Sequence, residues 1–82
     1  MRRGRFRVLR DILSAAKEPS TKTSIVYEAN LSFKQAKKYL TLLEKNGLVE
    51  SHKSKHKKFE ITEKGRNFLK TFEKLDDLIP EA

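Results

Sequence analysis

Apolar residues recur every three or four positions between residues 6 and 16, which is the spacing of one stripe along a helix. The stripe consists of Phe6, Leu9, Ile12, Leu13 and Ala16. The helix should end before Pro19, because proline removes a backbone donor and disfavours helical backbone in the residue before it. The polar stretch EPSTKT that contains Pro19 is therefore expected to be a loop.

A second, short helix is predicted through SIVYEA, with Ser20, Thr21 or Thr23 as its N-cap. Its inward positions are Ile25, Val26 and Ala29. Asn30 then suits the left-handed conformation of a tight corner, and Leu31 reaches back to the core. Ser32, with Gln35 three residues later, has the pattern of a capping box that starts a third helix. Two helices joined by such a short turn form a helix-turn-helix unit.

The third helix is expected over residues 32–46, with Gly47 at the left-handed position that closes it. At about 100° per residue, its apolar side chains fall on one side. These are Phe33, Ala36, Tyr39, Leu40 and Leu43. Lys34, Lys38, Thr41 and Lys45 fall on the other side, with Lys37 flanking them. The helix should thus have an apolar back and a cationic front.

The second half of the chain predicts two antiparallel strands, LVE and KFEIT, around a basic loop at residues 51–58. Thr62 can cap a last helix that carries one apolar stripe until Pro80 ends it. The stripe consists of Phe68, Leu69, Phe72, Leu75 and Ile79. The fold class is therefore mainly α with a small β-hairpin.

Composition changes this picture by indicating a partner. The 82 residues suffice for one domain, and their formal net charge of +8 favours a polyanion, with nucleic acid ahead of an anionic membrane. The basic N-terminus is not followed by the apolar run of a signal peptide, and no stretch is long and apolar enough to span a membrane. We therefore expect a cytoplasmic, nucleoid-associated protein that makes no membrane contact.

The order of these elements resembles a winged helix-turn-helix domain from residue 5 to about residue 79. The phrases SFKQAKKYLTLLEKNGLVE and FEITEKGRNFLKTFEKL are similar to a small archaeal winged-helix family of predicted transcriptional regulators. In that family a YL..L...GL recognition-helix end and a T.KG..FL entry to the last helix recur. The family is related to the ten-kilodalton archaeal chromatin proteins, which dimerise through a long antiparallel coiled coil. The last helix here has only about 16 residues, or roughly 24 Å, which favours a site-specific regulator over a chromatin role.

The resemblance implies duplex DNA binding by the third helix and the wing, with dimerisation through the C-terminal helix. Residues 1–61 would then form the DNA-binding domain with a basic N-terminal arm, and residues 62–82 a dimerisation element of the same domain. An architectural DNA or RNA binder and a protein-interaction module are the alternatives to a homodimeric transcriptional regulator.

The predicted DNA contacts form three groups. On the helix they are Ser32, Lys34, Gln35, Lys37, Lys38, Thr41 and Lys45; on the wing His52, Lys53, Ser54, Lys55, His56, Lys57 and Lys58; on the arm Arg2, Arg3 and Arg5. The lysines suit phosphates, whereas Ser32, Gln35 and Thr41 suit base edges. Each group has an alternative reading. Gln35 can serve in the capping box instead of contacting bases. The wing can be a solubilising hairpin, and the arm can be an ordinary basic terminus.

The apolar stripe of the last helix has two readings, since it can cover the core of its own domain or form a symmetric dimer contact. The dimer contact is favoured, because five large apolar residues exceed what a short wing needs for closure. Without cysteine, and with His52 and His56 four apart across a hairpin tip, no metal site is expected. We also expect no cofactor, no small-molecule substrate and no enzymatic activity, because the chain has no phosphate-binding loop and no candidate triad.

Overall fold

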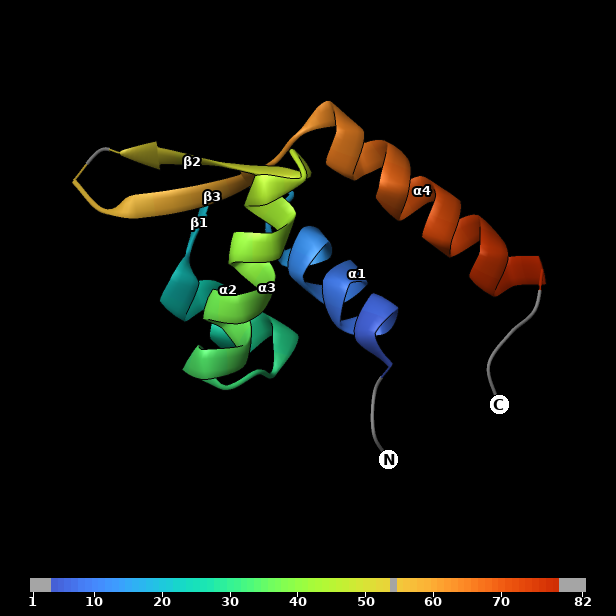
Figure 1. Ribbon diagram of the computed structural model, residues 1–82, viewed down its shortest axis with the longest axis horizontal. Coiled ribbons are helices and arrows are strands. Elements are labelled where there is room, and N and C mark those ends of the chain that lie inside the picture. The colour runs from blue at the N-terminus through green and yellow to red at the C-terminus, as the bar shows by residue number, and fades with distance from the viewer. Residues whose placement is uncertain (1–3, 54, 79–82) are drawn as a thin grey trace.

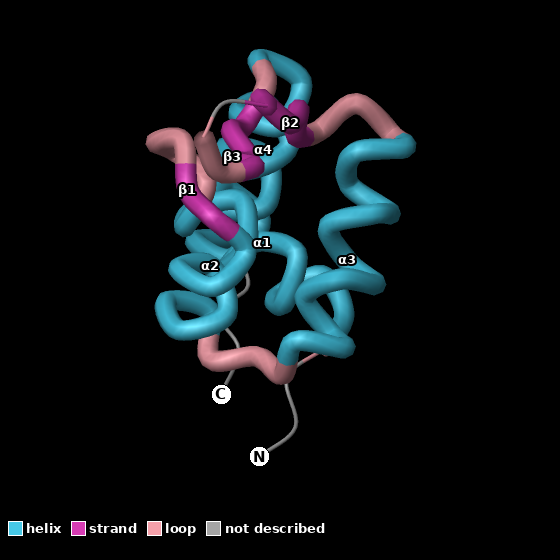
Figure 2. The backbone as a smooth tube through the Cα atoms, turned by 90° about the vertical axis from the view of Figure 1, so that its left-hand side faces the viewer, coloured by secondary structure: helices cyan, strands magenta, loops and turns pink. Residues whose placement is uncertain are grey.

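The computed structural model describes residues 4–53 and 55–78, except for the side chain of residue 76 (Figure 1). Its elements in chain order are α1 (Arg5–Ala15), β1 (Ser20–Thr21), α2 (Lys22–Ala29), α3 (Phe33–Lys45), β2 (Val49–Lys53), β3 (Lys57–Ile61) and α4 (Glu63–Leu78). The predicted class, mainly α with a small hairpin in the winged helix-turn-helix order, is confirmed. The strands lie at one end of the helices, and α3 runs along one side (Figure 2).

The core lies between α1, α2, α3 and the inner face of the hairpin. Its fully buried large side chains are Ile12, Leu13, Ile25, Leu43 and Val49. Two predicted core positions are wrong, since Phe6 is 55% exposed and Phe33 is 51% exposed. Both lie in the first turn of their helices, where the stripe extends beyond the buried core. Val8, which was not placed on the stripe, is buried instead.

The helix caps and the left-handed turn residues lie where the sequence predicts them. Thr21 caps α2, since its side chain accepts a hydrogen bond from the Ser24 N–H. Asn30 is left-handed with φ 55°, and Gly47 has φ 74°. Ser32 and Gln35 form the full capping box at the start of α3. Thr62 Oγ1 accepts from the Gly65 N–H at 3.0 Å and so caps α4.

The sheet contains three antiparallel strands in the order β1-β3-β2, and β1 was not predicted. It has only two residues, and Ser20 pairs with Phe59 while Thr21 pairs with Lys58. The predicted loop at residues 51–58 is also too long, because pairing continues as far as Lys53 opposite Lys57. The strands thus stay paired through their charged residues. Ser51 lies opposite Phe59 between the core and the tip.

The last helix, α4, extends away from the hairpin and lies alongside α1 (Figure 1). Leu69 is only 3% exposed, so it packs in the core of its own chain, and its prediction as a dimer-contact residue is wrong. Phe68 is half-buried against the same core. Leu75 and Leu78 lie farther along and are 59% and 71% exposed. Neither α4 nor any other helix among the described residues is long and apolar enough to cross a membrane.

Candidate nucleic-acid interface

The helix α3 presents the cationic front that the sequence predicts. Lys34, Lys37, Lys38, Thr41 and Lys45 are all exposed, whereas Ala36, Leu40 and Leu43 are buried on the opposite side. The Lys38 ammonium group lies 5.6 Å from the centre of the Tyr39 ring. The corner at Asn30 and the cap at Ser32 fix where this front begins, so the first turns of α3 are held in place by local hydrogen bonds.

Ser32 and Gln35 are exposed at the start of α3, and their side chains are engaged in the capping box. The Gln35 N–H donates to Ser32 Oγ, and the Ser32 N–H donates to Gln35 Oε1, both at 3.1 Å. Gln35 therefore has the capping role that was the alternative to base recognition. The side-chain oxygen of Gln35 is occupied, which leaves its amide N–H groups and the Thr41 hydroxyl as the polar groups of this front for reading base edges.

The wing divides its charges between two faces, because alternate residues of a strand point to opposite sides. Lys53 and Lys57 pair across the hairpin and share the inner face with Ser51 and Phe59. The outer face carries the His52–Lys58 pair and, nearer the base, Glu50 opposite Glu60. The lysines and histidines predicted for the tip at residues 51–58 are thus accompanied, nearer the base of the wing, by two carboxylates on its outer face.

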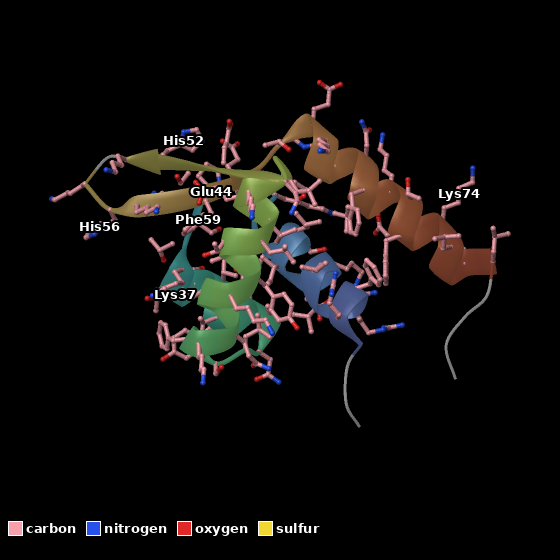
Figure 3. All side chains as sticks on the ribbon, in the orientation of Figure 1. Lys37, Glu44, His52, His56, Phe59 and Lys74 are labelled. Atoms are coloured by element: carbon pink, nitrogen blue, oxygen red, sulfur yellow. The ribbon has the colours of Figure 1, made fainter. Side chains whose placement is uncertain are left out.

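A hollow of about 350 Å³ lies between α3 and the wing. Its lining is Lys22, Lys37, Leu40, Thr41, Glu44, Lys57 and Phe59. Lys37, Glu44 and Phe59 lie in this region between α3 and β3 (Figure 3). Glu44 Oε2 accepts a hydrogen bond from Ser51 Oγ at 2.7 Å, which ties the helix to the hairpin. Three lysines from three elements thus surround an apolar floor.

Lys22 is the member of this group that the sequence did not reveal. It is the first residue of α2 and follows directly after β1, whose pairing with β3 brings it beside the wing. A two-residue strand leaves no periodic pattern, so only the loop composition of EPSTKT was visible in the sequence. Knowledge of the β1–β3 pairing was needed to place this lysine opposite α3.

Several predicted contacts lie elsewhere or outside the described residues. Arg5 is the first residue of α1, with its guanidinium carbon 5.7 Å from the centre of the Phe6 ring, so it does not belong to a flexible arm as predicted. Arg2, Arg3, Ser54 and Ile79 lie outside the described residues. Lys53, Lys55, His56, Lys57 and Lys58 are exposed on the hairpin, as is His52.

A tight helix-turn-helix corner, an exposed cationic α3 and a following β-hairpin together define a winged helix-turn-helix protein. Residues 2–80 match the winged helix-turn-helix family, and the chain belongs to that family.

Two archaeal proteins are similar to most of this chain. The uncharacterized protein MJ0287 of Methanocaldococcus jannaschii is 34% identical over 79 residues, which cover 95% of this chain and 78% of that protein. The crystal structure of Sso10a-2, a DNA-binding protein from Sulfolobus solfataricus, matches with a TM-score of 0.86 and 30% identity, over 93% of this chain and 81% of that one. The archaeal resemblance predicted from the sequence is thereby confirmed.

A bacterial structure shares the fold at lower identity. MepR, a transcription regulator of the Staphylococcus aureus multidrug efflux pump MepA, matches with a TM-score of 0.74 and 16% identity. The match covers 88% of this chain and 55% of MepR. At this identity the likeness concerns the fold alone.

Proposed function

We propose that this protein is a homodimeric DNA-binding transcriptional regulator in which α3 enters the major groove and the wing binds flanking phosphates. The observation that carries the proposal is the convergence of Lys22, Lys37 and Lys57, from three different elements, on the hollow beside α3. A DNA backbone that follows α3 into the groove would pass this hollow, where lysines can replace its counterions. Family membership and the similarity to the DNA-binding protein Sso10a-2 support the same proposal. Such a regulator would act in the cytoplasm, on the nucleoid.

The lysines and the polar groups divide the work of binding in this proposal. Lys34, Lys37 and Lys38 hold phosphates on either side of the groove, while Thr41 and the amide N–H groups of Gln35 contact base edges. The apolar ring of Phe33, exposed in the first turn of α3, suits a thymine methyl group.

Selection from a pool of random duplexes, sequenced after binding at moderate salt, tests this function directly. We expect enrichment of an inverted repeat with half-sites about one helical turn apart, because a two-fold symmetric dimer presents two copies of α3. Retention of duplexes without enrichment would replace the regulator by an architectural DNA binder. Duplex RNA in the same competition tests the RNA alternative, and the absence of any retention would overturn the proposal.

The surface proposed for dimerisation lies between α1 and the outer half of α4. A shallow apolar groove of about 350 Å³ is lined there by Phe6, Phe68, Thr71, Phe72 and Leu75. The Phe6 and Phe68 rings lie 6.5 Å apart, and Phe6 and Leu75 are each more than half exposed. Large apolar side chains left exposed in this way on a small domain are typical of a contact between subunits. With Leu69 in the core, the contact rests on Phe72, Leu75 and Leu78 of α4 and on Phe6 of α1.

We expect the substitution Leu75→Glu to convert the dimer to monomers, because it would bury an unpaired carboxylate in the contact on both subunits. Sedimentation velocity over a range of protein concentrations measures the effect. Lys74→Gln is the matched control, since Lys74 is exposed on the neighbouring position and points away from the body of the protein (Figure 3). A dimer that survives Leu75→Glu would place the subunit contact elsewhere.

A further inference from the structure

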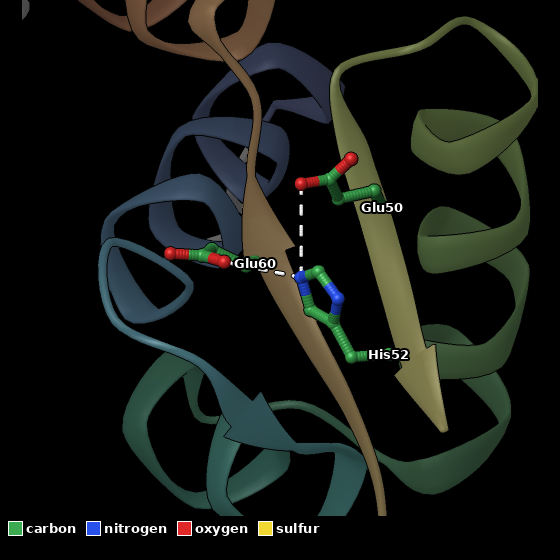
Figure 4. Close-up of side chains that lie close together, drawn as sticks. All are labelled: Glu50, His52 and Glu60. Atoms are coloured by element: carbon green, nitrogen blue, oxygen red, sulfur yellow. Dashed lines mark hydrogen bonds and ion pairs between the residues drawn. The ribbon is translucent and has the colours of Figure 1, made fainter. Parts of the chain in front are cut away.

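Three potential metal ligands meet on the outer face of the wing. His52 on β2 places Nε2 at 3.1 Å from Glu60 Oε1 on β3 and at 3.6 Å from Glu50 Oε1 on β2 (Figure 4). One ligand atom from each of the three residues lies within 4.8 Å of the other two. The three side chains come from two paired strands, so the pairing of the hairpin fixes their positions relative to one another.

The register of the hairpin places two carboxylates side by side, where a bound cation would lower their repulsion. Glu50 and Glu60 are direct cross-strand partners, and like charges at such positions destabilise a sheet. His52 is two residues beyond Glu50 on the same strand, so it lies on the same face. A protonated imidazole offers a single positive charge to two carboxylates, whereas a divalent ion offsets both and accepts the imidazole as a third ligand.

The two distances from His52 Nε2 suit a small tetrahedral ion, and the ligand atoms of the two glutamates lie within 4.8 Å of each other. In a zinc site with Zn–N and Zn–O bonds of about 2.1 Å, neighbouring ligand atoms lie about 3.4 Å apart. The two distances from His52 Nε2, 3.1 and 3.6 Å, lie on either side of this value. Imidazole nitrogen favours zinc and similar first-row ions over Mg²⁺ and Ca²⁺, which take oxygen ligands.

We propose that Glu50, His52 and Glu60 form a binding site for Zn²⁺ or a similar divalent first-row ion, with solvent as the fourth ligand. The ion would join β2 to β3 near the base of the wing and stabilise the hairpin. It would also offset the two carboxylates on the outer face, and the wing would become more cationic as a result. The site does not depend on the proposed DNA binding, because all three ligands belong to the hairpin itself.

The histidine spacing in the sequence did not reveal this site. His52 and His56 are four apart along the chain, but His52 stands on β2 while His56 lies at the tip (Figure 3). The ligands that accompany His52 are acidic residues whose proximity depends on the register of β2 and β3. Without that register, Glu60 is eight positions away from His52 along the chain and gives no metal motif.

Calorimetric titration of the purified protein with Zn²⁺, without DNA, tests the proposal. We expect one ion per chain and a weakening in His52→Gln and in Glu60→Gln of at least the roughly 10- to 100-fold that loss of even an outer-shell partner costs. All three ligands are partly or largely exposed, so these variants should fold normally. His56→Gln is the matched control, because it removes the other imidazole of the wing and should leave zinc binding unchanged.

Two further readouts sharpen the result. Co²⁺ in place of Zn²⁺ should give the intense visible absorption of a four-coordinate site in the wild type and in His56→Gln, and lose it in His52→Gln. Lys58→Gln should tighten zinc binding, because Lys58 lies opposite His52 and its positive charge opposes a second cation on this face. No zinc binding at millimolar concentration, or equal binding by His52→Gln and the wild type, would overturn the proposal and leave His52 as an ion-pair partner of the two glutamates.

Discussion

The double substitution Lys34→Glu and Lys38→Glu is expected to weaken duplex DNA binding by about 100-fold or more at moderate salt. Both lysines are exposed in the first two turns of α3, the part of a recognition helix that approaches the DNA backbone and base edges. Each loses a charge-assisted contact to phosphate, worth about 1.5–3 kcal/mol, and each new carboxylate adds repulsion. Fluorescence anisotropy with a labelled duplex measures the change.

The salt dependence of binding distinguishes direct phosphate contacts from attraction by the net charge of the protein. With roughly 4 to 6 phosphate contacts per subunit, log affinity should fall with log salt at a slope of about −4 to −5 per subunit. The double variant should reduce the magnitude of that slope by about 2. The matched control is Lys17→Glu with Lys70→Glu, which changes the net charge equally at a hollow beside α4 that no residue of α3 or of the wing lines. Equal losses in the two double variants would mean that net charge alone attracts the DNA, and no loss in either would remove α3 as the binding surface.

Features fixed by a few neighbouring residues were predictable from the sequence. The capping box at Ser32, the left-handed corner at Asn30 and the αL glycine at Gly47 each depend on contacts within a few positions. The two faces of α3 follow from its period alone, apart from Phe33. These local signals agree with one another along the chain, which is why the order of elements and the cationic front were both correct.

Features that depend on contacts between distant segments were not predictable. Phe6 satisfies the helical spacing but lies at the end of α1, where its ring reaches Phe68 of α4 instead of the core. Leu69 and Leu75 belong to one apolar stripe, yet only the first part of α4 packs against its own chain. The hollow at Lys22 and the cluster at His52 both depend on strand register, which the hydrophobic pattern specifies poorly for short strands with polar faces.

Gly65→Ala is expected to destabilise the protein by about 3 kcal/mol or more, although an alanine in a helix is ordinarily favoured over glycine by about 1 kcal/mol. Gly65 is buried in the first turn of α4. A methyl group at this position would lie 2.7 Å from Ile61 Cγ1 and closer still to the carbonyl oxygen of Leu48. Both distances are far below van der Waals contact, so either the helix or the loop must move.

The loop cannot retreat without losing other bonds. The Leu48 carbonyl oxygen accepts from the Thr62 N–H at 3.0 Å, and Thr62 Oγ1 donates to the Gly47 carbonyl oxygen at 2.6 Å. Lys64 Nζ also donates to the Asn46 carbonyl oxygen at 2.9 Å. Moving residues 46–48 away from α4 would break this connection between the end of α3 and the start of α4, at the base of the wing.

The three glycines of the chain provide a graded test by urea denaturation at one fixed protein concentration. Gly4→Ala should change the free energy of unfolding little, because among the described residues beyond its chain neighbours no atom lies within 4 Å of the added methyl group. Gly47→Ala has room but a φ of 74°, so a left-handed alanine should cost about 1–2 kcal/mol. Gly65→Ala should exceed both, with a fall in Tm of more than about 12 °C for a domain of this size. If Gly65→Ala proves as stable as the wild type, then α4 does not approach Leu48 so closely, and the position of α4, on which the proposed dimer contact depends, would have to be revised.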